Sequence, residues 1–314
     1  MYTIEENCRF KVFFMIVYDI ESFEKKKSKK WIFWTILIGI IVIGIAIFGG
    51  IKTAEYVASQ REQKIAQEEK EEQNNQQNKD TNNSNNEQQN TNNQKGLTKE
   101  QLKAIDNIYD SKEKIAFLTF DDGPSSNVTP KILDVLKKED IKATFFVLGT
   151  MAKANPEVLK REKEEGHYIA NHSYSHIYPK VYANENKPLE EYNKTNKIIQ
   201  DALGDSSYQS NLFRFPGGSV GGYYDKLKQK AKKKFREKGI SSLDWNCLTN
   251  DSDGAETKQA IMQNLKATSK GKKSLVILMH DAPNKDLTAK TLPDVIKYLK
   301  GQGYSFKSIY DVIE

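Results

Sequence analysis

The sequence predicts an α/β fold, a (β/α) barrel with about seven parallel strands, in the C-terminal two thirds of the chain. Two observations predict it. Apolar runs of strand length alternate with amphipathic runs of helix length from about residue 97 to residue 314, and repeated βα units of this kind build parallel sheets. Motifs rich in polar residues end several different strands. This favours a barrel, because a doubly wound sheet concentrates its chemistry at one switch point.

The predicted elements follow one another as strand, helix, strand along this region. The predicted strands are residues 114–120, 143–149, 168–171, 212–215, 240–245, 274–280 and 304–309. The predicted helices between them are residues 128–138, 156–165, 189–203, 223–238, 256–269 and 288–300.

The N-terminal part of the chain predicts a membrane anchor. Residues 31–48, a run of roughly 18, carry no charge and are long enough to cross a bilayer core as a helix. A lysine cluster at residues 25–30 precedes the run, and Trp31 and Trp34 stand at its start, so the positive-inside rule keeps the N-terminus in the cytoplasm. A cleaved signal peptide is the alternative, but its apolar region is shorter and ends in a small-residue cleavage site, which is not evident here.

Between the anchor and the predicted barrel, residues 74–94 are almost entirely Asn, Gln, Ser, Thr, Asp and Lys. A segment with so few apolar side chains does not offset the entropy of ordering, so it predicts a disordered tether. The predicted parts are therefore a cytoplasmic segment at 1–30, a transmembrane anchor at 31–51, a stalk and tether at 52–96 and an extracytoplasmic domain at 97–314. Met1 and Met15 both remain possible starts.

Charge and cysteine content exclude some classes of protein. The formal net charge of +6 is mild and owes much to the lysines before the anchor, so we expect no nucleic-acid partner. The basic segment 226–238 is interpreted as a solvated helix face, with an anionic wall polymer as the alternative partner. Cys8 and Cys247 fall on opposite sides of the membrane in this topology, so no disulfide framework is expected. We expect the domain at 97–314 to be monomeric.

Asp121 and Asp122 follow the first predicted strand and precede a Gly-Pro turn. Adjacent carboxylates at a strand end can face different directions, so one can bind a metal while the other accepts a proton from water. A solvated turn is the alternative, since Asp-Gly-Pro is ordinary loop chemistry.

His172 and His176 are four residues apart, so one helical turn would place both imidazoles on one side. Two structural histidines are the alternative for this pair taken alone. With the Asp122 carboxylate, however, the pair makes a two-nitrogen, one-oxygen ligand set that leaves coordination positions open for water and substrate.

Arg214 ends the fourth predicted strand, where a fixed cation can hydrogen-bond a carboxylate and hold it ionised. His280 ends the strand at 274–280 and is suited to protonate a leaving group, and Asp244, at the end of the preceding strand, is expected to orient it. A surface arginine and a core histidine are the alternatives. His167 has no chemical partner in the sequence and is assigned a structural role.

The motifs are Thr-Phe-Asp-Asp-Gly-Pro at 119–124, His-Ser-Tyr-Ser-His at 172–176, Arg-Phe-Pro-Gly-Gly at 214–218, Leu-Asp-Trp-Asn at 243–246 and Leu-Met-His-Asp at 278–281. In this order they resemble those of the polysaccharide deacetylases of carbohydrate esterase family 4, over roughly residues 110–314. The resemblance implies a deformed (β/α) barrel that holds one divalent metal ion, Zn²⁺ by preference, with Co²⁺, Ni²⁺ or Mn²⁺ as alternatives.

The resemblance also implies a role for each matching residue. The catalytic set is Asp121 as general base, Arg214 holding it, His280 as general acid and Asp244 as its partner. The metal ligands are Asp122, His172 and His176. The substrate and oxyanion set is the Gly217 amide, Pro216, Leu278 at the acetyl methyl, and Trp245.

Two departures from the family pattern affect these assignments. Many relatives carry an aromatic residue after the proline of the third motif, whereas this chain has Gly217, which widens the groove or leaves Tyr223 or Tyr224 to fill it. The fourth motif is reduced to residues 243–245, which makes the role of Asp244 less secure than those in the first two motifs.

The sequence thus predicts metal-dependent hydrolysis of N-acetyl groups of a cell-wall glycan, with N-acetylglucosamine of peptidoglycan as the preferred substrate. One alternative is a deacetylase or O-acetyl esterase for a chitin-like polymer, xylan or N-acetylmuramic acid residues. The other is a catalytically silent carbohydrate-binding barrel. Every expected catalytic position is filled, which argues against a silent protein.

Overall fold

The computed structural model describes residues 96–252 and 254–314. The chain divides into two units, residues 1–91 and 92–314, and the described residues belong to the second. The cytoplasmic segment, the membrane anchor, the stalk and the tether predicted above lie outside the described residues. Within residues 96–252 and 254–314, no helix is both long enough and apolar enough to cross a membrane.

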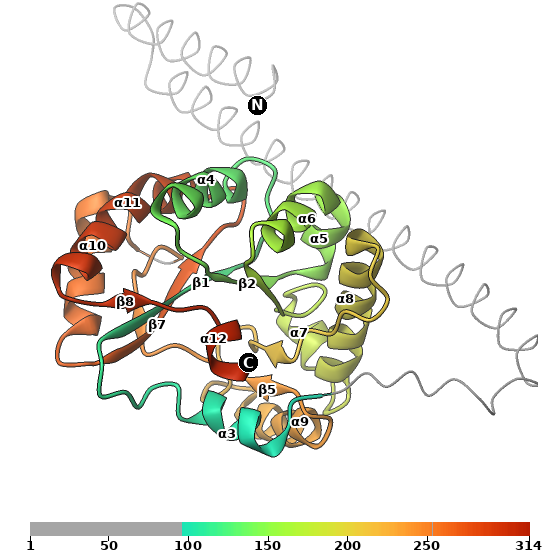
Figure 1. Ribbon diagram of the computed structural model, residues 1–314. Coiled ribbons are helices and arrows are strands. Elements are labelled where there is room, and N and C mark those ends of the chain that lie inside the picture. The colour runs from blue at the N-terminus through green and yellow to red at the C-terminus, as the bar shows by residue number, and fades with distance from the viewer. Residues whose placement is uncertain (1–95, 253) are drawn as a thin grey trace, which may run out of the picture. The chain divides into compact units, whose positions relative to one another are not determined.

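The described residues form one curled sheet in which all paired strands are parallel (Figure 1). The strands are β1 (Ile115–Asp121), β2 (Thr144–Val147), β3 (Tyr168–Asn171), β4 (Leu212–Phe213), β5 (Ser241–Ser242), β6 (Cys247–Leu248), β7 (Ser274–His280) and β8 (Ser305–Phe306). Their order is β5-β4-β3-β2-β1-β7-β6, and β8 pairs with the start of β1. The parallel α/β architecture is therefore confirmed.

The barrel is incomplete at one place. The path of strands ends at β5 and β6, and within the described residues no ladder joins these two. Each has only two residues. Of the predicted strand at 240–245, residues 241–242 pair as β5, and β6 at 247–248 was not predicted. The chain leaves the sheet at residue 243, and it returns as β6 beside β7, so the prediction missed a break in the sheet at this point.

Helices cover the outer face of the sheet, as Figure 1 shows for α4, α6, α8 and α11. The helices are α3 (Lys99–Asp106), α4 (Thr129–Glu139), α5 (Gly149–Ala154), α6 (Pro156–Glu164), α7 (Tyr178–Val181), α8 (Lys187–Leu203), α9 (Asp225–Glu237), α10 (Lys258–Ser269), α11 (Asp286–Gly301) and α12 (Tyr310–Ile313). All six predicted helices are present with shifted ends. The short α3, α5, α7 and α12 were not predicted.

Local sequence explains how several of these helices begin and end. Thr98 caps α3 in a capping box with Gln101, which satisfies two amides that the helix leaves free. Pro188 lies in the first turn of α8, where its missing N–H costs nothing, and Gly204 ends the helix in a left-handed conformation at φ 66°. The long α8 lies beside β3, where Asn171 Nδ2 donates to the Tyr192 carbonyl, and this position matters for the site.

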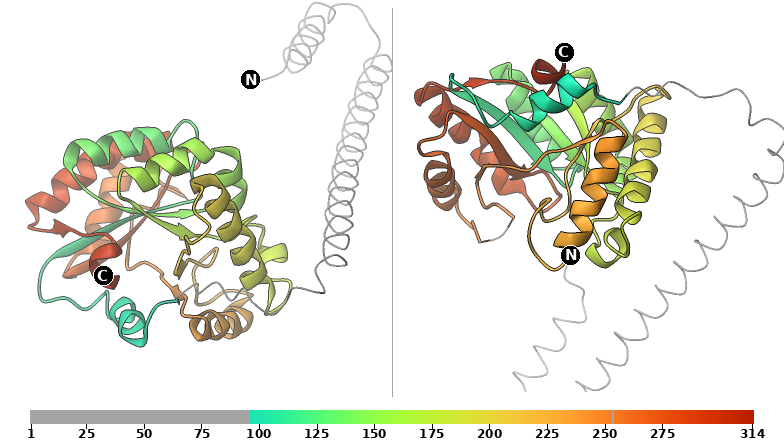
Figure 2. Two further views of the ribbon diagram at one scale, coloured as in Figure 1. Left: turned by 45° about the vertical axis from the view of Figure 1, so that its right-hand side comes forward. Right: turned by 90° about the horizontal axis from the view of Figure 1, so that it is seen from below.

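The alternation of side chains along β1 separates core from site. Ala116, Leu118 and Phe120 pack in the larger core, under the outer helices. Phe117 packs in a second core inside the curled sheet, to which α3 and α12 contribute apolar side chains. These two helices contact each other (Figure 2). Because successive side chains point to opposite faces, Asp121 lies on the same inner face as Phe117.

Candidate active site

Two adjacent carboxylates end β1, and the backbone turns them toward different partners. Asp121 keeps to the inner face of the strand, and its side chain is buried. Asp122 has a left-handed backbone, with φ at 77°, which is uncommon for a residue with a side chain. Its amide donates to the carbonyl of Phe146 on β2. The two carboxylates are thus held apart, as the sequence predicted.

Asp122, His172 and His176 converge on one point. Their ligand atoms all lie within 4.8 Å of one another, with Asp122 Oδ1 3.7 Å from His172 Nε2 and 3.6 Å from His176 Nε2. Asp122 Oδ1 is buried and accepts no hydrogen bond within the described part of the chain, so a cation would satisfy it. Two imidazole nitrogens with one carboxylate oxygen suit a zinc-type ion and leave a position for water. The three residues fit the metal that the family resemblance implies.

The two histidines reach the site from a loop. Residues 172–177 form no helix, and Ser173 and His176 have left-handed backbones with φ at 74° and 55°. The carboxylate of Glu191 on α8 accepts hydrogen bonds from the amide of Tyr174 and from the next amide. The predicted helical turn is therefore wrong, because α8 holds the loop from outside. The imidazole rings still lie side by side, with centroids 5.0 Å apart.

The protonation of His172 follows from its surroundings. Its Nδ1 lies 2.7 Å from the carbonyl oxygen of Arg214. A carbonyl only accepts, so Nδ1 carries the proton, and the lone pair of Nε2 faces Asp122. Burial lowers the pKa of His172 to about 3, which keeps the ring neutral, the form that binds a metal.

Arg214 is fully buried and holds Asp121. Its Nη1 donates to Asp121 Oδ1 at 2.7 Å and to Thr119 Oγ1 at 2.8 Å, and its Nε donates to the carbonyl of Leu243. The other Asp121 oxygen lies 3.6 Å from His172 Nε2, beside the ligand cluster. The predicted contact between Arg214 and Asp121 is confirmed.

Opposing effects act on the pKa of the Asp121 carboxyl. Burial raises the pKa of its carboxyl, and although Arg214 and His280 act in the opposite direction, burial has the larger effect. Arg214 acts in the direction that the sequence argument gave it, because it favours the ionised form. A carboxylate with a raised pKa is a stronger proton acceptor, which suits a general base.

His280 pairs with Asp251 rather than with Asp244. His280 Nδ1 donates to Asp251 Oδ1 at 3.0 Å, and the His280 amide donates to Oδ2 at 2.8 Å. Thr288 on α11 also donates to Oδ2, at 2.7 Å. Burial lowers the pKa of His280, but the hydrogen bond and charge of Asp251, with smaller effects from Asp121 and Asp122, outweigh it and raise the pKa.

Asp244 has a different position from the one predicted. Its carboxylate accepts from the amide of Ser219 at 2.9 Å and from the Ser219 hydroxyl at 2.6 Å, and its carbonyl accepts from Arg214 Nη2. It anchors the glycine-rich loop after β4, so the expected Asp244–His280 pair is corrected. Sequence reasoning missed Asp251 because it assumed one strand through residues 240–245, whereas Asp251 follows the separate strand β6. The available signal in the sequence was that Asp251 lies three residues after the short apolar segment that forms β6.

The predicted oxyanion and substrate residues lie around this loop and β7. Gly217 has φ at 74°, and its amide makes no hydrogen bond to any described residue, so it is free to bind an oxyanion. The Pro216 carbonyl accepts from Tyr182 Oη at 2.7 Å. Leu278, on β7, is buried, and the Trp245 ring lies 5.7 Å from the Arg214 guanidinium.

The space beside Gly217 is filled by a different tyrosine from the two that were predicted. A Cβ on Gly217 would lie 2.6 Å from Tyr178 Oη. Tyr223 is 95% exposed and contacts Tyr224, and Tyr224 packs on Tyr182 with ring centroids 5.0 Å apart. The expectation that Tyr223 or Tyr224 fills this space is therefore corrected.

Two further ionisable groups are buried in the core, one beside the site and one away from it. Asp281 accepts from Thr129 Oγ1 at 2.6 Å and lies against Gly123. Through these contacts it fixes the turn after the two aspartates, and burial raises its pKa to about 7. It was not singled out from the sequence. His167 is buried, its Nδ1 accepts from the Ala143 amide, and burial lowers its pKa to about 4. These contacts agree with the structural role predicted for His167.

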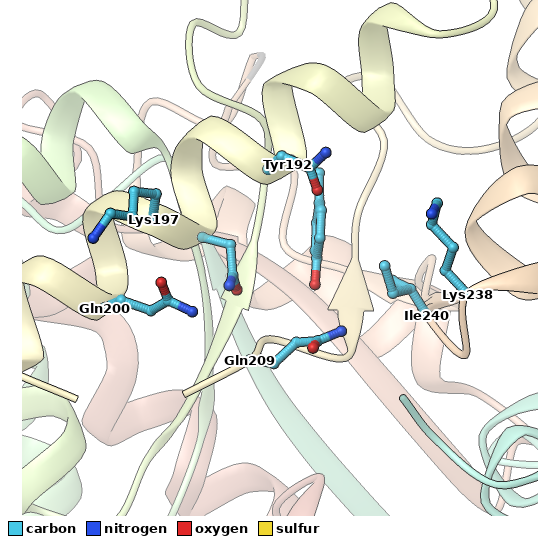
Figure 3. A pocket seen from close by; sticks show the side chains of 8 residues that line it. Tyr192, Lys197, Gln200, Gln209, Lys238 and Ile240 are labelled. Carbon is cyan, nitrogen blue, oxygen red and sulfur yellow. The ribbon is translucent and has the colours of Figure 1, made fainter. Parts of the chain in front are cut away.

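A polar cavity of about 470 Å³ lies apart from these residues, beside α8, and shares none of them (Figure 3). Two of the side chains that line it donate hydrogen bonds to backbone carbonyls of residues 208–210. Gln200 Nε2 donates to the Tyr208 carbonyl, and Tyr192 Oη donates to the Ser210 carbonyl. We interpret this cavity as structural.

Comparisons with known proteins agree with the site. The family model described as polysaccharide deacetylase matches residues 109–235. The chain is 36% identical over 218 residues to a peptidoglycan-N-acetylglucosamine deacetylase of Bacillus cereus, covering 68% of this chain and 76% of the relative. It is 36% identical over 192 residues to the peptidoglycan-N-acetylglucosamine deacetylase PgdA of Listeria monocytogenes, covering 61% of this chain and 37% of that relative.

Two further matches broaden the comparison. A peptidoglycan-N-acetylmuramic acid deacetylase of Bacillus subtilis is 32% identical over 221 residues, which cover 68% of this chain and 79% of the relative. The solved structure of a Streptococcus mutans CE4 esterase superposes with a TM-score of 0.59 at 32% identity, covering 66% of this chain and 90% of that one. The chain belongs to the polysaccharide deacetylase family. It is a hydrolase, and the curated relatives named here all act on peptidoglycan.

Proposed function

We propose that this protein removes acetyl groups from N-acetylglucosamine units of peptidoglycan in a reaction that requires one divalent metal ion, Zn²⁺ by preference. One observation carries the proposal. Asp122 Oδ1, which accepts no hydrogen bond from the described residues, and two imidazole nitrogens meet beside the buried Asp121–Arg214 pair. His280 ends the neighbouring strand. Two relatives named for this substrate support the choice of sugar. The products are acetate and a free amino sugar.

Each group has a separate task in this reaction. When bound by Asp122, His172 and His176, the ion supplies Lewis acidity and makes water a stronger acid. Asp121 accepts a proton from the attacking water, and Arg214 keeps its carboxylate aimed at the site. The free Gly217 amide donates to the charge that develops on the acetyl oxygen.

The acid side of the reaction belongs to His280. Its Nδ1 proton is held by Asp251, which leaves Nε2 to protonate the departing amine. Asp121 and His280 are direct partners in the register of β1 and β7, so base and acid end neighbouring strands. This arrangement allows a proton to be taken on one side of the acetyl carbon and returned on the other.

Mass spectrometry of purified muropeptides tests the substrate. The full chain in detergent, loaded with Zn²⁺, should remove one acetyl group from the N-acetylglucosamine residue of each disaccharide, and the Asp121→Asn protein should leave the mass unchanged. Removal from the N-acetylmuramic acid residue instead would correct the sugar. Activity confined to O-acetylated xylan or to chitin-like oligomers would replace the substrate class, and no hydrolysis of any of these glycans would favour a binding protein.

We also propose that the protein is a single-pass membrane protein whose catalytic domain lies outside the cytoplasm. The uncharged run at 31–48 and the lysines before it support this proposal. Protease added to intact cells should cut within residues 52–96 and release the domain. A domain that stays protected until the membrane is opened would contradict the orientation.

A further inference from the structure

We propose that Tyr178 determines substrate specificity, by forming one wall of the subsite for the sugar that carries the reacting acetyl group. The inference rests on the proposed function and deepens it. Tyr178 begins α7, two residues after the metal-ligand candidate His176, and its ring meets the His176 ring edge-on, with centroids 5.6 Å apart. The side chain thus lies at the rim of the ligand cluster.

Tyr178 and any side chain at position 217 compete for the same space. The Tyr178 hydroxyl lies where the Cβ of a larger residue would be, 2.6 Å from that position. Gly217, at φ 74°, has no side chain to occupy this space, and its amide makes no hydrogen bond to a described residue. The first residue of α7 therefore supplies an aromatic wall beside Gly217, where the loop after β4 has no side chain.

The ring is held in place from behind. Tyr182, the residue that follows α7, packs edge-on against it with centroids 5.9 Å apart. Tyr182 is in turn fixed by its hydrogen bond to the Pro216 carbonyl and by contact with Tyr224. A ring that is already positioned before binding loses little conformational entropy when a ligand arrives.

The ring and the hydroxyl of Tyr178 are both available to contact a ligand. It is 39% exposed, although large apolar side chains are usually covered. Its hydroxyl makes no hydrogen bond to any residue in 96–252 or 254–314. Tyrosine presents an apolar ring and a polar tip. A pyranose matches both, because its C–H face packs on a ring while its hydroxyl or acetamido groups exchange hydrogen bonds with the tip.

A purely structural role makes a different prediction. If Tyr178 only supported His176, its loss would weaken metal binding and slow every substrate equally. If Tyr178 contacts the sugar, its loss matters only for substrates that have one. A small aryl acetate, which offers the acetyl group without a sugar ring, separates the two cases.

The test compares Tyr178→Ala and Tyr178→Phe with the wild-type full chain, all loaded with Zn²⁺. Substrates are an N-acetylglucosamine oligosaccharide and 4-nitrophenyl acetate, and bound zinc is measured by elemental mass spectrometry. Tyr178→Ala should lower kcat/KM for the oligosaccharide on the order of tenfold, through a higher KM, the scale expected for one aromatic contact and one hydrogen bond. Its rate on the aryl ester and its zinc content should match the wild type.

Tyr178→Phe keeps the ring and should lose less on the oligosaccharide than Tyr178→Ala. Tyr298→Ala, which removes a partly buried tyrosine on α11, is the matched control and should leave both substrates unaffected. Equal losses on both substrates, lost zinc, or an unchanged oligosaccharide rate in Tyr178→Ala would each overturn the inference. A wild-type protein that cleaves the aryl ester but no glycan would instead contradict the proposed function itself, and the inference with it.

Discussion

The site has two halves, and they are built differently. The base half comprises Asp121, Asp122, His172, His176 and Arg214, which end or follow β1, β3 and β4. Its contacts are short and buried, such as the 2.7 Å bond from Arg214 to Asp121. The acid half comprises His280 and its partner, and there the partner comes from a loop after a strand of two residues.

The comparison shows under which condition the position of a residue along a strand predicts its contacts. β1, β2 and β3 pair in continuous parallel register, so residues at their C-terminal ends come together. At β5 and β6 the ladder is broken, and the chain between them is irregular. A residue there is placed by hydrogen bonds such as those of Asp251 with His280 and Thr288, which no strand pattern contains.

The largest expected effect concerns the base half. His172→Ala removes one of three ligands, so zinc content should fall and hydrolysis should be lost. Far-UV circular dichroism should show the domain still folded, because the ring contributes little to the main cores. Full zinc occupancy in this variant would remove His172 from the ligand set.

The next effect concerns the acid half. His280→Ala should keep its zinc but lower turnover on the order of 10²-fold or more, the usual scale for one proton-transfer group. The alkaline limb of the pH profile should flatten, because its titrating acid is gone. An unchanged alkaline limb would mean that another group donates the proton.

A smaller effect distinguishes Asp251 from Asp244. Asp251 raises the pKa of His280, with smaller effects from Asp121 and Asp122. An acid works below its pKa, so activity falls as pH rises through that value. Asp251→Asn should lower the pKa, and the fall in kcat should then occur at lower pH, with a loss of about tenfold near neutrality.

Asp244→Asn is the matched control for Asp251→Asn. It changes a carboxylate that binds Ser219 and does not contact His280. The pH profile should stay in place, and stability against urea should drop by about 1 kcal/mol through the weakened loop anchor. A shifted alkaline limb in Asp244→Asn, with none in Asp251→Asn, would restore the pairing that the sequence suggested.

Much of the fold and of the base half could be predicted from sequence. The long apolar strands, the Asp-Asp-Gly-Pro turn and the arginine that ends the fourth predicted strand are local patterns that the sheet register brings together. The tyrosine that fills the space at Gly217 could not be predicted, because it depends on how two loops pack. The same holds for the helical turn expected at His172 and His176, since Glu191 from a distant helix sets that loop.

The division of labour between the two adjacent aspartates is the central claim of this account. It is tested most directly by measuring zinc content and deacetylase activity of Asp121→Asn and Asp122→Asn side by side. Asp121 faces Arg214, and Asp122 faces the two histidines. Asp121→Asn should therefore bind zinc and be inactive, whereas Asp122→Asn should lose zinc. If Asp121→Asn loses the metal while Asp122→Asn keeps both metal and activity, the assignment of base and ligand is reversed.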